Sequence, residues 1–306
     1  MRHFDAPPDR PSDFAVPPGF RFVDPHVHLF DHAQALSWRF HDRGYDHPRL
    51  KGAWRLDDDR FSVPQYQREV AGLGVEKFVH IQSGYSEADP ALETAWLQSL
   101  SDRYGMPNAM MSGCDLASDG AAAVLDVQSA HRGWRGVRHT GALDSVGSDA
   151  FMSGYRELVT RHGVCDLWVE IDQFPALTEI ARQHSDVIVV LEHAGLPVVS
   201  KLDAYQERWR TSMKELAKSP NVVCKISALS SGALPNFFVD SIRDWVLHCI
   251  DAFGPDRCMF ASNFPIDRMF VTYPRLLSAF RRVVENFTPT EQRQLFAETA
   301  ERVYRI

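Results

Sequence analysis

Val187-Ile188-Val189-Val190-Leu191-Glu192-His193 is the stretch of sequence that decides the fold. An unbroken apolar run of mostly β-branched residues gives way abruptly to two polar residues. A strand that is apolar at every position is buried on both faces, as in a parallel sheet covered by helices. The stretch therefore predicts an interior strand of an α/β protein, with Glu192 and His193 at its carboxyl end.

Similar apolar runs recur along the chain, separated by segments with helical periodicity. The predicted strands are 20–23, 77–82, 108–114, 134–139, 164–171, 186–192, 221–227 and 257–261. The predicted helices are 63–71, 89–103, 120–131, 148–162, 175–183, 203–218, 236–253, 273–285 and 289–304. This alternation predicts a single (β/α)8 TIM barrel of the α/β class with an extra C-terminal helix. A doubly wound open sheet is the alternative, although no glycine-rich phosphate fingerprint follows the first strand.

The domain organisation predicted from the 306 residues is a short arm followed by one barrel, because α/β barrels commonly exceed 250 residues as a single unit. Residues 1–19 are rich in Pro, Asp and Arg and form the predicted N-terminal arm, and residues 20–306 form the barrel. The irregular segment 32–61 is too long for a simple connection and is predicted to be a lid over the site.

Composition restricts the partners. The net charge is −7 and no run of Lys and Arg occurs, so nucleic acid and anionic membranes are not expected partners. No apolar run is long enough to cross a membrane. The five cysteines show no paired spacing, which favours reduced thiols and a cytoplasmic location. A small molecule is the expected partner, and the oligomeric state, a homodimer included, stays open.

A pair of histidines follows the first predicted strand, in Asp24-Pro25-His26-Val27-His28. Alternate side chains of a strand share a face, so His26 and His28 are expected to point the same way, with Asp24 beside them. Two imidazoles on one face can hold a divalent ion or bind one polar ligand atom.

Polar residues also stand where the other predicted strands end. In a TIM barrel the carboxyl ends of the strands surround the active site, so these residues are expected to meet at the mouth of the barrel. They are Gln82, Ser83, Asp115, Arg138, His139, Glu170, Gln173, Glu192, His193, Lys225, Ser227, Ser262, Asn263 and Asp267.

The motifs together resemble the amidohydrolase superfamily, and within it the amidohydrolase-2 type, which includes lactonases acting on 2-pyrone-4,6-dicarboxylate and on sugar-acid lactones. The resemblance covers about 22–306 in the expected order. It lies in the His-x-His pair and in 136–139, 190–195, 223–229, 256–265 and 295–305.

The resemblance implies a hydrolase that opens a lactone by means of water activated at a mouth lined by histidines. It implies His26, His28 and His193 as catalytic residues and as ligands of one divalent ion, zinc or manganese. In other lactonases of this branch no metal is used, and histidines and arginine donate hydrogen bonds to the developing oxyanion.

Positive side chains near the mouth predict a substrate that carries a carboxylate, since the planar guanidinium of arginine matches this group. The residues predicted to bind substrate are Gln82, Arg138, His139, Gln173 and Lys225. The opposing interpretation is that Arg138 and Lys225 pair with carboxylates inside the barrel.

One departure from the family pattern affects the mechanism. The strand-eight aspartate is replaced by Asn263, whose amide cannot accept a proton at neutral pH. Asn263 and Asp267 remain predicted catalytic residues, and the base is left open between His193, Asp267 and Glu192. Two other functions are retained as alternatives: a metal-assisted decarboxylase of the same family, and a barrel that only binds ligands.

Overall fold

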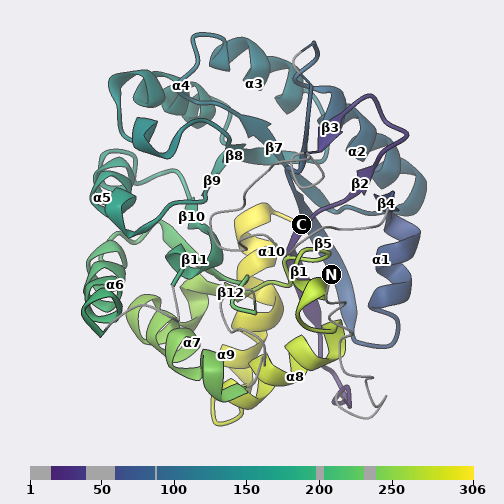
Figure 1. Ribbon diagram of the computed structural model, residues 1–306, viewed down its shortest axis with the longest axis vertical. Coiled ribbons are helices and arrows are strands. Elements are labelled where there is room, and N and C mark those ends of the chain that lie inside the picture. Colours follow the sequence, from purple (N-terminus) through teal and green to yellow (C-terminus); the bar gives the residue numbers. More distant parts are fainter. Residues whose placement is uncertain (1–14, 39–58, 87, 198–202, 231–238) are drawn as a thin grey trace, which may run out of the picture.

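A computed structural model of the protein describes residues 15–38, 59–86, 88–197, 203–230 and 239–306. Within these residues an eight-stranded parallel sheet curls into a barrel surrounded by helices (Figure 1). The order β1-β5-β7-β8-β9-β10-β11-β12 follows the sequence, so each strand of the barrel pairs with the next barrel strand along the chain. The predicted TIM barrel is confirmed.

The strands of the barrel are short and nearly all buried. They are β1 (Phe22–Val27), β5 (Val75–Ile81), β7 (Ala109–Cys114), β8 (Trp134–His139), β9 (Val164–Leu167), β10 (Val189–Leu191), β11 (Val222–Ile226) and β12 (Cys258–Phe260). The first and last strands meet at a parallel bridge between Val27 and Phe264, which closes the barrel near its carboxyl end.

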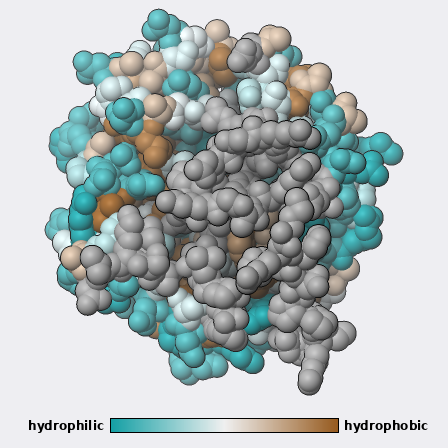
Figure 2. Space-filling model, viewed as in Figure 1, coloured by the Kyte–Doolittle hydropathy of each residue, from teal (hydrophilic) through white to brown (hydrophobic). Residues whose placement is uncertain are grey.

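Helices cover the outside of the barrel. They are α1 (Val63–Glu69), α2 (Leu92–Tyr104), α3 (Ala121–Ser129), α4 (Asp149–Thr160), α5 (Phe174–Gln183), α6 (Asp203–Leu216), α7 (Val239–Phe253) and α8 (Tyr273–Val283). On the face shown in Figure 2, hydrophilic side chains predominate around the rim, with smaller hydrophobic patches between them. This is the pattern of helices that bury one apolar stripe against a sheet.

The C-terminal segment forms the floor of the barrel. It consists of α9 (Pro289–Arg293), the π-helical turn η7 (Gln294–Glu298) and α10 (Thr299–Tyr304), where the sequence predicts one helix over 289–304. Ala297, Ala300, Val303 and Tyr304 pack against inward-facing strand residues such as Val190, and together they make a core separate from the one under the outer helices.

A bulge in β1 changes which face its residues occupy. The partner of Asp24 on β5 is Phe78, but the partner of Val27 is His80, so β1 carries one extra residue. As a result Asp24 points outward, where it accepts hydrogen bonds from Tyr66 and Tyr273. The expectation that Asp24 lies on the same face as the two histidines was wrong, because strict alternation does not anticipate a bulge at Pro25.

The predicted strand over 164–171 ends earlier, at Leu167. Glu170 and Gln173 instead form a reciprocal capping pair at the start of the short helix η3 (Ile171–Gln173), which turns the chain away from the sheet. The other predicted strands and helices differ from the observed bounds by a few residues at each end.

Two predicted segments fall largely outside the described residues. Residues 39–58 of the predicted lid and 1–14 of the predicted arm belong to the part of the chain that the structure does not describe. The base of the lid segment is held by two small antiparallel pairs, β2 (Phe30–Asp31) with β4 (Arg60–Phe61) and β3 (Ser37–Trp38) with β6 (Gly84–Tyr85). None of the described helices is long and apolar enough to cross a membrane.

Candidate active site

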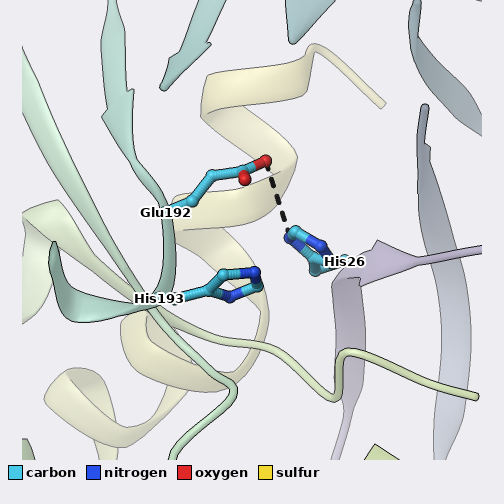
Figure 3. Close-up of side chains that lie close together, drawn as sticks. All are labelled: His26, Glu192 and His193. Carbon is cyan, nitrogen blue, oxygen red and sulfur yellow. Dashed lines mark ion pairs between the residues drawn. The ribbon is translucent and has the colours of Figure 1, made fainter. Parts of the chain in front are cut away.

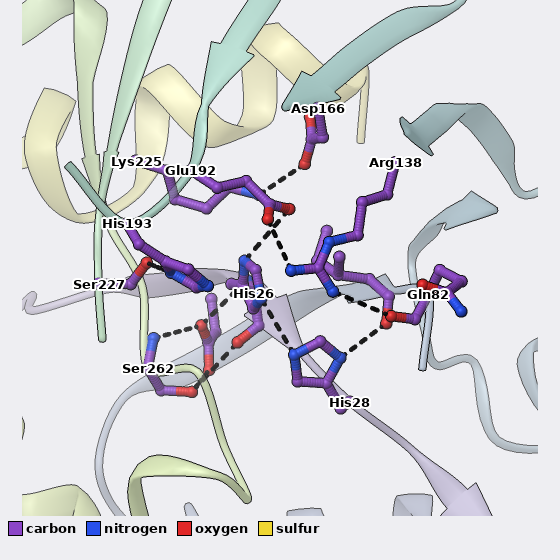
Figure 4. A network of polar contacts seen from close by, with 12 residues as sticks. His26, His28, Gln82, Arg138, Asp166, Glu192, His193, Lys225, Ser227 and Ser262 are labelled. Carbon is purple, nitrogen blue, oxygen red and sulfur yellow. Dashed lines mark hydrogen bonds and ion pairs between the residues drawn. The ribbon is translucent and has the colours of Figure 1, made fainter. Parts of the chain in front are cut away.

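The histidines predicted at the mouth come together in three dimensions. The rings of His26 and His193 lie 4.5 Å apart between centroids, although 166 positions separate them in the sequence, and the rings of His26 and His28 lie 4.8 Å apart. His26 and His28 come from the end of β1, whereas His193 follows β10 (Figure 4). All three side chains are buried.

Hydrogen bonds determine which ring nitrogen of His26 carries the proton. His28 Nδ1 lies 2.9 Å from the Ile81 carbonyl oxygen, which can only accept, so Nδ1 carries the proton of a neutral His28. His28 Nε2 is then bare and accepts from His26 Nε2, 3.1 Å away. This leaves His26 Nδ1 without a proton.

The bare His26 Nδ1 faces another acceptor. Glu192 Oε1 lies 3.8 Å away (Figure 3), and neither of these two atoms takes part in a hydrogen bond among the described residues. The other Glu192 oxygen, Oε2, forms an ion pair with Arg138. Two buried acceptors that face each other repel unless a cation or a proton lies between them. The gap is therefore suited to a positively charged species.

The donor set fits a divalent ion. One ligand atom each from His26, Glu192 and His193 lies within 4.8 Å of the others, and all three residues are buried. Two imidazole nitrogens and one carboxylate oxygen are a common set of zinc ligands. In this group Glu192 takes the place that the sequence assigns to His28, because His28 is turned toward Ile81.

Burial keeps the first two histidines neutral. It lowers the pKa of His26 well below its usual value, and the charge of Lys225 adds to this effect. It also lowers the pKa of His28, with the charge of Arg138 contributing. Neutral imidazoles can bind a metal ion or exchange hydrogen bonds, so both remain usable at neutral pH.

An unusual turn directs His193 into the site. The four residues from His193 to Leu196 all have left-handed backbone angles, with φ between 54° and 63°, and only Gly195 adopts such angles without strain. The indole of Trp209 donates to the Ala194 carbonyl at 3.0 Å, and His193 Nδ1 lies 2.7 Å from the Ser227 hydroxyl. These contacts stabilise the turn and orient the imidazole.

Arg138 contacts the candidate ion group through Glu192. Its Nη2 lies 2.9 Å from a Glu192 oxygen, and its Nη1 donates to the main-chain carbonyl of Gln82 at 3.3 Å. The side chain stays 13% exposed, whereas Glu192 has no exposure. Arg138 thus pairs inside the barrel, as the opposing interpretation predicts, and also keeps an accessible edge.

Lys225 lies deeper than the sequence suggests. Its Nζ forms a 2.7 Å ion pair with Asp166, and neither side chain is exposed. Burial raises the pKa of Asp166 to about 6, and Lys225 opposes this rise. Lys225 therefore has no surface with which to contact a substrate at the mouth.

The two predicted catalytic residues after β12, Asn263 and Asp267, are hydrogen-bonded to each other. The Asn263 amide donates to one Asp267 oxygen at 2.8 Å, and the Ser230 hydroxyl donates to the other. Asn263 has a φ of 58°, which asparagine tolerates better than most residues. Both Asp267 oxygens already accept hydrogen bonds, whereas Oε1 of Glu192 accepts none among the described residues, so Asp267 is the weaker candidate for the base.

Three predicted substrate-binding residues lie at different distances from the cluster. Gln82 is at the mouth, but its amide donates to the Gly84 carbonyl. His139 lies on the outer face of β8, where it packs against the ring of Phe151 and accepts from the Leu116 amide. Gln173 accepts from the Glu170 amide in the turn after β9, so the structure brings neither His139 nor Gln173 to the cluster.

Two residues that hold Lys225 in place, Asp166 and Tyr304, were not identified from the sequence. Asp166 stands within an apolar run, and a charged residue at such a position is a recognisable signal of an internal partner. Tyr304, which donates to both Asp166 oxygens at 3.0 and 3.2 Å, gives no such signal.

Comparisons with known proteins identify the family of the chain. A family model described as amidohydrolase (Amidohydro_2) matches residues 23–306. The chain is 31% identical to the uncharacterized protein y4mH of Sinorhizobium fredii, over 96% of this chain and 100% of that one. It is 30% identical to an L-fucono-1,5-lactonase of Burkholderia multivorans, over 83% and 97%. A crystal structure of a Burkholderia multivorans amidohydrolase with bound zinc superposes with a TM-score of 0.78 at 24% identity, covering 94% of this chain and all of that one.

Proposed function

Because the chain belongs to this amidohydrolase family, we propose that it is a hydrolase that opens a lactone of a sugar acid or of another carboxylate-bearing compound. The observation that carries the proposal is the group formed by His26, Glu192 and His193 at the carboxyl ends of the strands, with two unpaired acceptors facing one another. The lactonase relatives support a cyclic ester as the substrate class.

The reaction adds water to the lactone carbonyl and breaks the bond between the carbonyl carbon and the ring oxygen. In the proposed mechanism Glu192 accepts the proton of the attacking water through Oε1, the oxygen that faces His26, while Arg138 pairs with Oε2. The ring oxygen leaves with a proton as an alcohol, and the product is a hydroxy acid.

Arg138 holds the Glu192 carboxylate in place and presents its remaining edge to the substrate. Its positive charge also favours the negative charge that develops on the carbonyl oxygen.

A divalent ion fits the same group. His26, Glu192 and His193 would hold it, and when bound it would lower the pKa of a water and polarise the carbonyl. The nearby cations Arg138 and Lys225 oppose a second positive charge, so we expect weak binding.

The assay that tests the function compares products. Purified protein is supplied with a panel of lactones, including L-fucono-1,5-lactone and 2-pyrone-4,6-dicarboxylate, and acid release is followed in weakly buffered solution. Lactone opening releases a proton. Release of CO₂ with consumption of protons from an aromatic acid would instead identify a decarboxylase, and binding without turnover would identify a ligand-binding barrel.

Chelation is expected to lower the lactonase activity. Protein treated with EDTA and then freed of chelator should lose about tenfold or more in kcat/KM, and zinc or manganese should restore it. The metal content of each sample is measured in parallel. Full activity in protein that contains no ion would exclude the metal route and leave Glu192 acting directly on water.

Arg138→Lys is expected to weaken the binding of carboxylate-bearing lactones selectively. The lysine keeps a positive charge opposite Glu192 but loses the planar fork, so KM should rise by about 10-fold to 100-fold. A neutral lactone serves as the control, and its KM should change by less than about threefold. Equal losses on both substrates would contradict a role in carboxylate recognition.

A further inference from the structure

A column of three buried side chains stands beneath the histidine group. Tyr304, on α10, donates through its hydroxyl to both oxygens of Asp166 on β9, at 3.0 and 3.2 Å. Asp166 in turn pairs with Lys225 on β11 at 2.7 Å (Figure 4). We call these three residues the lysine column, and none of them is exposed to solvent.

Stability alone gives no reason for an ion pair at this depth. Removing a lysine and an aspartate from water is costly, and an apolar pair of similar volume is often as stable or more stable. The inner core around it includes Val164 on β9, Val190 on β10 and Val223 on β11. The pair is therefore a candidate for a role in the chemistry above it.

The ammonium of Lys225 acts on the site from below. The backbone of Lys225 is level with Glu192, because Cys224 is opposite Leu191. Its partner Asp166 is opposite Val190, two residues below Glu192, so the Lys225 side chain points down from the site. The positive charge of Lys225 thus lies under the candidate site formed by His26, Glu192 and His193.

The C-terminal helix holds this charge in place. The Tyr304 ring lies 5.3 Å from Lys225 Nζ, so the ring contacts the ammonium while the hydroxyl fixes its counter-ion. The Tyr304 carbonyl accepts from Arg135 Nε at 2.8 Å, which anchors the end of α10 to β8. α10 therefore contributes to the floor of the site as well as to the core.

We infer that Lys225 is a positioning residue of this enzyme: held by Asp166 and Tyr304, it supplies a fixed positive charge beneath His26 and Glu192 that stabilises the transition state and weakens the binding of cations. The inference rests on the proposed lactonase function for its kinetic part only. Lys225 does not touch the substrate, so its charge should affect kcat more than KM.

The test uses a double variant, Asp166→Leu with Lys225→Met, which removes both charges and leaves no buried ion without a partner. Lys225→Met alone leaves Asp166 buried without its counter-ion and should lower the Tm by about 10 °C, whereas the double variant should regain most of that loss. If the column acts on the chemistry, kcat of the double variant stays about 10-fold to 100-fold below the original while KM changes by less than about threefold. Restored Tm together with an unchanged kcat would overturn the inference.

A second readout does not depend on turnover. Zinc is titrated calorimetrically into protein stripped of metal, and the double variant should bind it about tenfold more tightly. The reason is that Asp166 starts one layer further from the site than Lys225, so the repulsion by the ammonium outweighs the attraction by the carboxylate. An affinity equal to that of the original chain, or zinc binding undetectable in both, would overturn the inference. If the original chain opens no lactone, the proposed function fails while the zinc comparison still decides the role of Lys225.

Tyr304→Phe is the milder variant should the double one fail to fold. It keeps both charges and the ring but removes the hydroxyl that holds Asp166, so kcat should fall about threefold to tenfold. Tyr155→Phe is the matched control, since the Tyr155 hydroxyl is equally buried but has no hydrogen-bond partner among the described residues. If both substitutions lower kcat equally, the Tyr304 hydroxyl does not act through Asp166 and Lys225, and the inference is contradicted.

Discussion

Replacing His26 with alanine is expected to lower kcat/KM for lactone hydrolysis by about 10³-fold or more. The substitution removes the bare Nδ1 that faces Glu192 and the Nε2 proton that His28 accepts. It therefore removes one of the three side chains able to hold an ion, and His28 also loses a hydrogen bond that orients its ring. Steady-state kinetics on the best lactone of the panel measures the loss.

His131→Ala is the matched control, because His131 is half-buried and lies outside the site. It should retain the kcat/KM of the original chain within about twofold. Circular dichroism and thermal unfolding of both variants separate lost chemistry from lost folding. An active His26→Ala protein, within about tenfold of the original, would contradict the role assigned to the histidine group.

Replacing Asp24 with alanine should lower the free energy of unfolding by about 4 kcal/mol. The Asp24 carboxylate is fully buried and accepts from the Ser262 amide and hydroxyl at 2.9 and 2.6 Å, and from Tyr273 at 2.7 Å. These bonds tie β1 to the segment after β12 and to α8. Without the carboxylate, several donors remain buried with no acceptor.

Urea unfolding at neutral pH measures this loss. Tyr273→Phe is the comparison, since it removes one donor and keeps the acceptor, and it should cost about 1 kcal/mol. A loss below about 1 kcal/mol for Asp24→Ala would show that the carboxylate does not hold the seam between the first and last strands.

The barrel could be predicted because its signals are local. Apolar runs such as 187–191 predict buried strands, and the polar residues that follow them mark the rim. The approach of His193 to His26 followed from the fold, since the carboxyl ends of all the parallel strands share one rim of the barrel. The family resemblance then predicted a catalytic and metal-binding role for these histidines.

The rest depends on geometry that a linear pattern does not contain. Arg138 and His139 are adjacent in the sequence, yet strand alternation puts one inside the barrel and the other under α4. The depth of Lys225 depends on Asp166, two strands away. Glu192 replaces His28 in the candidate ion site because the Ile81 carbonyl holds His28 in a different direction.

The seam between β1 and β12 has a consequence for biosynthesis. The bridge of Val27 with Phe264, and the contact of Tyr304 with Asp166, join segments that leave the ribosome far apart in time. During translation the β1 edge stays without its neighbour until β12 has emerged, and such long-range pairing slows folding. The rim that carries the candidate site is therefore complete in the nascent chain only after β12 and α10 have joined the barrel.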